Sequence, residues 1–449
     1  MRVRMRARAM GAATLVGALV VTGLTSDASG GAGTDPTTVA PTTVVQHQNP
    51  RADEPGTPDA PGDEVPGPRL RRPAKPAKDL VRPPRPERTG VTEAVREVVG
   101  YTGRREHRFK FPGAEYVKIH FSRLAVVPGD KVMVTDASGT EVHSYRADPR
   151  VLSLPGDSPV TYDESSGFWA MSVHGDTAVV KLDSTAERLT GSTGLADLTS
   201  YGFAIDRVAH GVTGAEKTPA GPGSEESVCG GDDMADVACY ESDYPTEYRH
   251  SRAVARLLIN GTSLCTAFRV GSRNRMLTNH HCFSQAGQAR NTEVWFGYEC
   301  RACDDHTVGR VTKVVGSDVL GTDRQLDYTL FTVSDFGSVR DYGYLELATG
   351  RADRGEKVYI PQHPDGDRRQ IAMDSDADSE GACQVEDPRY DGYFDGSDVA
   401  YRCDTAPGSS GAPVLSRESD KVLALHHFGG CPNSGVRGDL LHDEIGDQV

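Results

Sequence analysis

Apolar and polar residues alternate in short runs between about residues 90 and 212, for example in EYVKIHF, KVMVTDA and TAVVKLD. Turn sequences such as PGD, ASG and HGD separate these runs. A period of two that is broken by glycine-containing turns is typical of antiparallel strands. The pattern predicts a small β-sandwich over residues 91–213. Because the segment holds no cysteine and no recognisable polar site, we interpret it as a prodomain or accessory domain.

A second region with strand and turn patterning covers residues 229–449. It is rich in Val, Thr and Tyr, and its length suits a pair of packed β-barrels. Residues 214–228, between the two regions, combine Gly, Pro and Ser, which favours an exposed linker open to proteolytic processing. The whole chain contains 49 Gly, 27 Pro and only 7% aromatic residues, a balance that suits turn-rich strands. The predicted fold class is therefore all-β.

The first 90 residues lack this patterning. A head with four arginines precedes a short apolar run at 12–24 and a small-x-small sequence, SDA, which together predict a secretory signal peptide over residues 1–28. The run is too short for a membrane anchor, and no later segment is apolar enough to insert stably into a bilayer. Residues 29–90 are dominated by Pro, Ala, Asp, Thr and Arg, so we expect a disordered Pro-rich linker. The protein is expected to be secreted.

Charge and cysteine are both concentrated in the C-terminal half. Residues 221–449 hold 22 Lys and Arg against 38 Asp and Glu, a net of −16, which leaves +1 of the whole-chain −15 for residues 1–220. An acidic domain of this kind argues against a nucleic-acid partner. All nine cysteines lie between Cys229 and Cys431, which in an exported chain indicates a disulfide framework with one thiol left over.

Metal sites are weakly indicated. Cys300 and Cys303 have C-x-x-C spacing, but no second pair completes a tetrahedral zinc site. The alternating acidic residues of 374–380 lack the glycine and distant glutamate of an EF-hand, so a solvated acidic surface is the favoured interpretation over calcium binding. We expect no metal and no cofactor.

Three short segments together carry the candidate chemistry. They are LTNHHC, which contains His281, LDYTL, which contains Asp327, and DTAPGSSGAP, which contains Ser410. A serine hydroxyl is a poor nucleophile unless a base takes its proton, and a carboxylate must hold that base in the right tautomer. Glycines flanking Ser410 permit a tight turn, in which the N–H groups of Gly408 and Ser410 would stabilise an oxyanion.

Each segment alone has a simpler interpretation. GSSGAP is compatible with an ordinary turn, His281 with a buried histidine beside a disulfide, and Asp327 with the end of a strand. The order His, Asp, Ser, with tens of residues between members, favours a catalytic triad instead.

These segments resemble the trypsin-like serine peptidases. In that family the catalytic histidine precedes a cysteine, so the resemblance implies that His281 rather than His280 is the base, with Asp327 and Ser410 as its partners. The sequences SVCGGDDMADVACYESD and LALHHFGGC resemble, more closely, the bacterial lysyl and glutamyl endopeptidase-like enzymes. The resemblance implies a chymotrypsin-like domain of two β-barrels over residues 229–449. It also implies the disulfides Cys229–Cys431, Cys265–Cys282, Cys383–Cys403, and Cys239 with either Cys300 or Cys303.

Three positions of the resemblance bear on activation and specificity. Ser409 stands where mammalian relatives carry an aspartate, so activation by a new N-terminal amine is not expected, and removal of the sandwich would have to relieve any inhibition. Asp404 and His426 occupy the expected substrate pocket. Asp404 favours cleavage after Arg or Lys, whereas His426 leaves cleavage after Glu or Asp open.

The resulting prediction is a secreted, monomeric serine endopeptidase that acts on protein or peptide substrates. A catalytically silent binding protein on the same scaffold, and an esterase or amidase with the same triad, are the alternatives.

Overall fold

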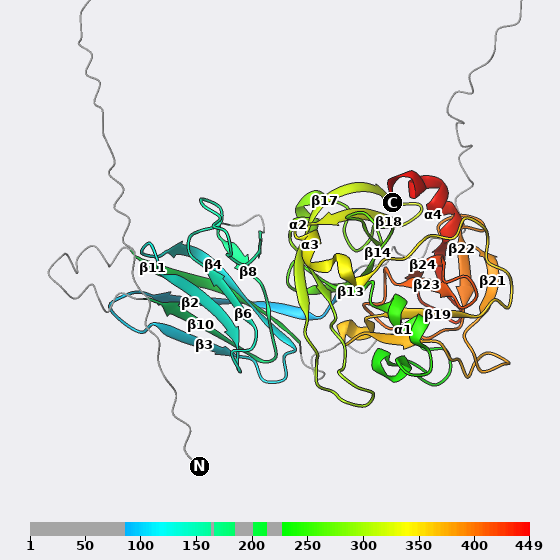
Figure 1. Cartoon of the computed structure of the whole chain (residues 1–449), viewed down its shortest axis with the longest axis horizontal. Coiled ribbons are helices and arrows are strands. Elements are labelled where there is room, and N and C mark those ends of the chain that lie inside the picture. The colour runs from blue at the N-terminus through cyan, green and yellow to red at the C-terminus, as the bar shows by residue number, and fades with distance from the viewer. Residues whose placement is uncertain (1–85, 163–165, 185–200, 213–226) are drawn as a thin grey trace, which may run out of the picture. The chain divides into compact units, whose positions relative to one another are not determined.

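The computed structural model describes residues 86–162, 166–184, 201–212 and 227–449 (Figure 1). The predicted signal peptide, most of the Pro-rich linker and most of the predicted processing segment lie outside these residues. Strands dominate what is described, so the all-β prediction is confirmed. None of the described helices is both long and apolar enough to cross a membrane.

The first group of strands forms the predicted sandwich of two antiparallel sheets. One sheet has the order β3 (Glu106–Lys110), β10 (Thr177–Asp183), β5 (Lys131–Asp136) and β6 (Val142–Tyr145). The other has the order β2 (Gly90–Val99), β11 (Gly202–Gly211), β4 (Tyr116–Ala125), β8 (Phe168–Ala170) and β7 (Val160–Thr161), with β9 (Val173–His174) also paired to β4. Alternate side chains from both sheets, among them Phe121, Tyr145 and Phe168, form the core between them. The alternation seen in the sequence is therefore the burial pattern of a two-layer sandwich.

The second group begins with a closed barrel. Its strands run in the order β14 (Ser263–Arg269), β13 (Val254–Ile259), β16 (Thr292–Phe296), β17 (Thr312–Asp323), β18 (Tyr328–Val333) and β15 (Met276–Thr278), and β15 pairs back onto β14. A short strand, β1 (Glu87–Arg88), adds to the outer edge of β14 by antiparallel pairing. This strand falls inside the stretch predicted to be linker, so ordered structure begins a few residues earlier than expected.

A second barrel-like sheet follows. Its order is β12 (Ala235–Asp236), β20 (Gln370–Ala372), β19 (Val358–Gln362), β23 (Pro413–Ser416), β24 (Val422–Phe428), β25 (Asn433–Arg437), β22 (Asp398–Tyr401) and β21 (Val385–Tyr390). A bridge between Lys357 and Gln384 joins the starts of β19 and β21. The described α-helices are short and lie between strands or at the end: α1 (Pro245–Ser251), α2 (Ala286–Arg290), α3 (Phe336–Val339) and α4 (Gly438–Ile445).

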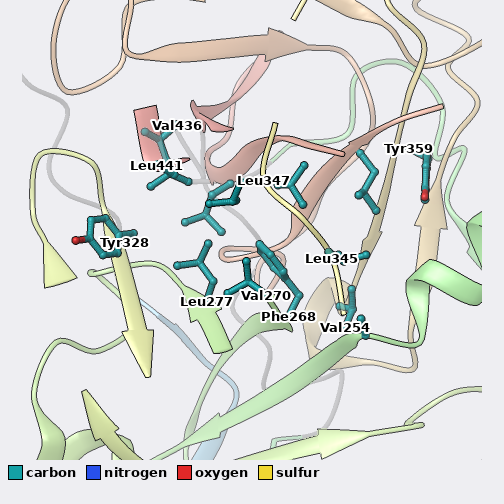
Figure 2. Close-up of a cluster of buried hydrophobic side chains, with 14 of the residues drawn as sticks. Val254, Phe268, Val270, Leu277, Tyr328, Leu345, Leu347, Tyr359, Val436 and Leu441 are labelled. Atoms are coloured by element: carbon teal, nitrogen blue, oxygen red, sulfur yellow. The ribbon is translucent and has the colours of Figure 1, made fainter. Parts of the chain in front are cut away.

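An apolar cluster joins the two barrels (Figure 2). Val254, Phe268 and Leu277 come from the first barrel, and Val436 and Leu441 come from β25 and α4. All are buried, so side chains from both barrels pack together in this cluster. Residues on loops where the barrels meet are consequently held on a rigid support.

Four disulfides brace this domain: Cys229–Cys431, Cys239–Cys303, Cys265–Cys282 and Cys383–Cys403. They confirm the predicted pairing and decide the open alternative for Cys239. The remaining thiol, Cys300, is buried, and burial raises its pKa to about 11. A buried thiol of this kind is a poor nucleophile at neutral pH.

Candidate active site

His281 and Asp327 lie at the ends of adjacent strands of the first barrel. His281 follows β15, and Asp327 immediately precedes β18, which pairs with β15. Asp327 Oδ2 accepts a hydrogen bond from His281 Nδ1 at 2.8 Å, and Oδ1 accepts one from the His281 main-chain N–H at 3.0 Å. His280 points elsewhere, with its Nδ1 2.9 Å from Thr322 Oγ1. Because a carboxylate only accepts, Nδ1 of His281 carries the proton, and Nε2 is the nitrogen that can act as a base.

The environment of Asp327 keeps its side chain ionised. Burial alone would raise its pKa, but the charges and hydrogen bonds of His281 and His427 outweigh burial and hold the pKa well below its ordinary value. The main chain of Asp327 is left-handed, with φ of 42°, a conformation that aspartate tolerates better than most residues. A buried, ionised carboxylate is thus fixed against one imidazole edge.

The loop that carries Ser410 is tied to strand β14. The Ser410 carbonyl accepts the N–H of Thr266 at 2.8 Å, and the Gly408 carbonyl accepts the Thr266 hydroxyl at 2.9 Å. Cys282 Sγ, next to His281 in sequence, lies 3.9 Å from the Ser410 carbonyl, and Cys282 is itself bonded to Cys265 of β14. One strand therefore positions both the Ser410 loop and the His281 loop.

Two glycines make the Ser410 turn feasible. Gly411 has φ of 92°, and a Cβ there would lie 2.0 Å from the Thr266 carbonyl oxygen. Gly408 has φ of 101°, and a Cβ there would lie 2.9 Å from the His363 carbonyl oxygen. Any other residue would be strained at both positions. The glycine requirement expected from the sequence thus has a direct steric basis.

His281 borders a cavity. His281 Nε2 is buried and has no hydrogen-bond partner among the described residues. A cavity of about 270 Å³ borders His281 and Asp327 and is also lined by Phe283, Arg324 and Tyr393. An imidazole that is oriented through Nδ1 and has no hydrogen-bond partner at Nε2 is arranged to accept a proton.

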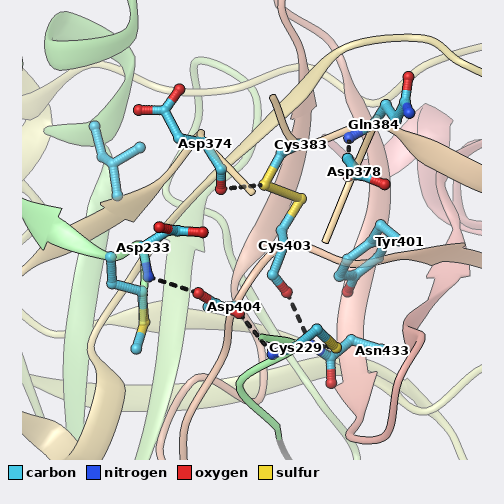
Figure 3. Close-up of a disulfide and its surroundings, with 12 residues drawn as sticks. Cys229, Asp233, Asp374, Asp378, Cys383, Gln384, Tyr401, Cys403, Asp404 and Asn433 are labelled. Carbon is cyan, nitrogen blue, oxygen red and sulfur yellow. Dashed lines mark hydrogen bonds between the residues drawn. A yellow bond between two sulfur atoms is a disulfide. The ribbon is translucent and has the colours of Figure 1, made fainter. Parts of the chain in front are cut away.

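Asp404, predicted to line the substrate pocket, bonds two main-chain N–H groups (Figure 3). Its Oδ1 accepts the N–H of Cys229 and its Oδ2 accepts the N–H of Asp233, both at 2.7 Å. The residue is 1% exposed, and burial raises its pKa. The carboxylate therefore holds the first residues of the protease domain, and these contacts give no support to a role in selecting Arg or Lys.

Replacing Asp404 by asparagine is expected to destabilise the fold without changing the residue after which cleavage occurs. An amide can accept only one of the two N–H groups well, so we expect a loss of about 1–3 kcal/mol in the free energy of unfolding. Denaturant unfolding checks this loss, with the exposed Asp443→Asn as control, and mass spectrometry of peptide products checks specificity. A changed cleavage residue at unchanged stability would restore Asp404 to the substrate pocket.

His426 is buried on β24. Its Nδ1 and the Tyr401 hydroxyl share a hydrogen bond of 2.6 Å. Burial lowers its pKa to about 3, and the neighbouring charges of His427 and His281 act in the same direction. His426 is therefore a neutral imidazole at physiological pH, which offers no positive charge to an acidic substrate side chain in the structure as it stands.

Two residues of the site escaped the sequence prediction: His427 and Asp398. His427 Nδ1 lies 3.2 Å from Asp327 Oδ2, and His427 Nε2 lies 2.8 Å from Asp398 Oδ2. The adjacent histidines in LALHHFGG could have indicated His427, but a role was predicted only for His426. Asp398 lies in GSDVA, a sequence with no distinguishing motif.

Two groups of possible metal ligands also occur in the described residues. Cys265, His281 and Cys282 form one group, and Cys239, Cys303 and Asp304 form the other. The cysteines of both groups are disulfide-bonded, which removes the thiolates that zinc would need. Neither group is suited to hold an ion in this state.

The site geometry agrees with comparisons to known proteins. The family model of the trypsin-like peptidase domain matches residues 265–425, which include all three candidate triad residues. Secreted RxLR effector protein 73 of Plasmopara viticola is 34% identical over 341 residues, a match that covers 74% of this chain and 79% of that protein. The chain belongs to the trypsin-like peptidase family. As a trypsin-like peptidase it is a serine endopeptidase, which confirms the predicted enzyme class.

More distant similarities accompany this trypsin-like peptidase. The uncharacterized protein y4fB of Sinorhizobium fredii is 30% identical over 245 residues, covering 50% of this chain and 34% of that protein. The chain thus spans about a third of that relative's length. Among solved structures, a Glu endopeptidase in complex with MPD is 20% identical, with a TM-score of 0.36. The match covers 49% of this chain and 97% of the Glu endopeptidase chain. The inactive form of the Rv3671c protease is 16% identical, with a TM-score of 0.34. The match covers 46% of this chain and 94% of the Rv3671c chain.

Proposed function

We propose that this trypsin-like peptidase hydrolyses peptide bonds with Ser410 as nucleophile, His281 as general base and Asp327 as the residue that orients His281. In the first half-reaction, Ser410 Oγ attacks the substrate carbonyl carbon while His281 Nε2 takes the hydroxyl proton. His281 then returns that proton to the leaving amine, and an acyl-enzyme remains. Water, deprotonated by His281, hydrolyses the ester and releases Ser410.

The N–H groups of Gly408 and Ser410 are proposed to stabilise the oxyanion in both steps. The left-handed conformation of Gly408 supports this role, because it fixes the turn in which the two groups lie. Losing one such donor typically costs about 2.7–4 kcal/mol of transition-state stabilisation.

The observation that carries the proposal is the contact between His281 and Asp327. Both oxygens of Asp327 are bonded to His281, and the Ser410 loop is fixed to the same strand and disulfide that brace the His281 loop. A merely structural histidine would not need an ionised carboxylate on one nitrogen while the other has no hydrogen-bond partner.

We propose further that the enzyme acts outside the cytoplasm, as a monomer, on protein or peptide substrates. Four disulfides support an oxidising compartment. The preference for Arg or Lys that Asp404 suggested is not supported by its contacts, so the substrate residue is best read directly from the products.

The test combines a covalent probe with a product analysis. Purified protein, with and without cleavage of the segment between the sandwich and the barrels, is treated with a fluorophosphonate, and the adduct is located by mass spectrometry. The same samples digest denatured casein and a small ester. An adduct on Ser410 with casein hydrolysis supports the proposal. No adduct in any sample would favour a silent scaffold, and ester turnover without casein cleavage would favour an esterase.

A further inference from the structure

His427 connects the candidate triad to a second buried carboxylate. It lies on β24, between Asp327, which precedes β18 of the first barrel, and Asp398, at the start of β22 in the second. All three side chains are essentially inaccessible to water, with relative exposures of 0–1%. The imidazole therefore bridges the two barrels within the active site, at the oxygen of Asp327 that also accepts from His281.

The hydrogen bonds define the charge of His427. Each of its nitrogens faces a carboxylate oxygen, and a carboxylate can only accept, so both nitrogens must carry a proton. Asp398 is in turn held by the hydroxyls of Ser434, at 2.8 Å from Oδ2, and Ser397, at 2.7 Å from Oδ1. The bridge is thus a cationic imidazolium between two fixed anions.

Other groups near His427 do not compete for this role. His281 bonds to the same Asp327 oxygen and not to His427. His426 is the neutral neighbour in the chain, and the ring of Tyr393 meets that of His427 edge-on, with ring centroids 5.6 Å apart. Burial alone would lower the pKa of His427, but the charges and hydrogen bonds of Asp398 and Asp327 raise it to about 9.

We propose that His427, as an imidazolium held by Asp398, is a positioning residue for catalysis: it fixes the Asp327 carboxylate against His281 and balances its buried charge. This role rests on the proposed function of the triad. His427 does not touch the substrate, and its effect passes through Asp327. An ordinary neutral donor would orient Asp327 too, but it would leave two buried anions without a compensating cation.

A consequence is that activity depends on the charge of His427. Its pKa in the folded protein lies above its ordinary value, so its contribution is complete below the ordinary value and is lost as pH rises through about 9. We therefore expect kcat of the wild type to fall on the alkaline side with a midpoint near pH 9.

The test compares His427→Asn, Asp398→Asn and the double variant in the full-length enzyme. Asparagine keeps a polar group near the Nδ1 position but no charge, so His427→Asn should lower kcat about ten- to a hundredfold with KM unchanged, and should abolish the alkaline midpoint. Asp398→Asn should move that midpoint down by about one pH unit or more, because the imidazolium loses its partner. The double variant, which restores charge balance, should recover part of the kcat that His427→Asn loses.

Two controls make the outcome decisive. The exposed His306→Asn should leave every parameter at the wild-type value. In addition, histidine-labelled Ser410→Ala protein, which needs no activity, can be titrated by NMR to follow the protonation of His427. A neutral His427 at pH 7, or a His427→Asn enzyme with wild-type kcat and alkaline midpoint, would overturn the inference. Absence of any Ser410-dependent hydrolysis would instead defeat the proposed function, while the titration would still report the bridge.

Discussion

Replacing Ser410 by alanine is expected to lower kcat about 10⁶-fold while leaving the fold intact. The substitution removes one oxygen atom. The bonds that fix the loop remain, from the Thr266 N–H to the Ser410 carbonyl and from the Thr266 hydroxyl to the Gly408 carbonyl. Without the proposed nucleophile no acyl-enzyme can form, and His281 has no hydroxyl proton to accept. A loss of this size is typical when the serine of a triad is removed, because its members act as one unit.

Hydrolysis of a fluorogenic peptide measures this loss, with fluorophosphonate labelling as a second readout. Ser419→Ala, at an exposed serine, is the matched control and should behave as the wild type. An unchanged melting temperature shows that the Ser410 variant is folded. If Ser410→Ala kept more than a few per cent of wild-type turnover, another residue would have to be the nucleophile.

The sequence predicted the architecture well because strand patterning and turns are local properties. Alternation in runs such as KVMVTDA was sufficient to identify the sandwich strands. The short strand β1 was missed, since two residues in an Arg- and Pro-rich stretch show no periodicity, and their pairing partner lies more than 170 positions away at Ser263 and Leu264. Long-range pairing of this kind leaves no trace in a single sequence.

The same distinction between local motifs and long-range contacts applies to the candidate site. His281, Asp327 and Ser410 were identifiable as candidates because the proposed chemistry imposes local sequence motifs, above all the glycines around Ser410 that the turn requires. Asp398 had no such motif, and its role comes only from the approach of β22 to His427. Asp404 was assigned by position relative to Ser410, but its contacts with the main chain at 229 and 233 depend on a segment far away in the chain.

A buried ion pair connects the sandwich to the first barrel. Lys118 on β4 and Glu293 on β16 form it, with side-chain exposures of 1% and 0%. Glu293 also accepts hydrogen bonds from the Ser172 hydroxyl at 2.6 Å and the Trp295 indole at 2.9 Å. Burial alone would raise the pKa of Glu293, but Lys118 and Lys313 outweigh it and lower the pKa to about 2. Its contribution to stability is therefore complete above its ordinary pKa and is lost as pH falls towards 2.

This ion pair spans the predicted processing segment, because Lys118 precedes residues 214–228 and Glu293 follows them. Cleavage there would break the covalent link but leave the Lys118–Glu293 contact and the pairing of β1 with β14 in place. A sandwich that leaves the enzyme must expose an unpaired carboxylate and an unpaired ammonium group to water. Separation of the sandwich after cleavage therefore requires that this ion pair and this strand pairing break.

Replacing Lys118 by methionine is expected to cost about 3–5 kcal/mol, because it leaves Glu293 buried with too little compensating charge. The double variant Lys118→Met/Glu293→Gln should recover most of that loss, since neither side chain of the pair is then charged and the introduced amide oxygen can still accept one of the hydrogen bonds. The chain has only two tryptophans, so guanidinium unfolding followed by Trp295 emission in a Trp169→Phe background reports on this region. Lys131→Met, which breaks the exposed pair with Asp183 at 3.6 Å, should cost less than about 1 kcal/mol. Equal, small losses for Lys118→Met and Lys131→Met would mean that water reaches Glu293 and that the sandwich does not seal this face of the barrel.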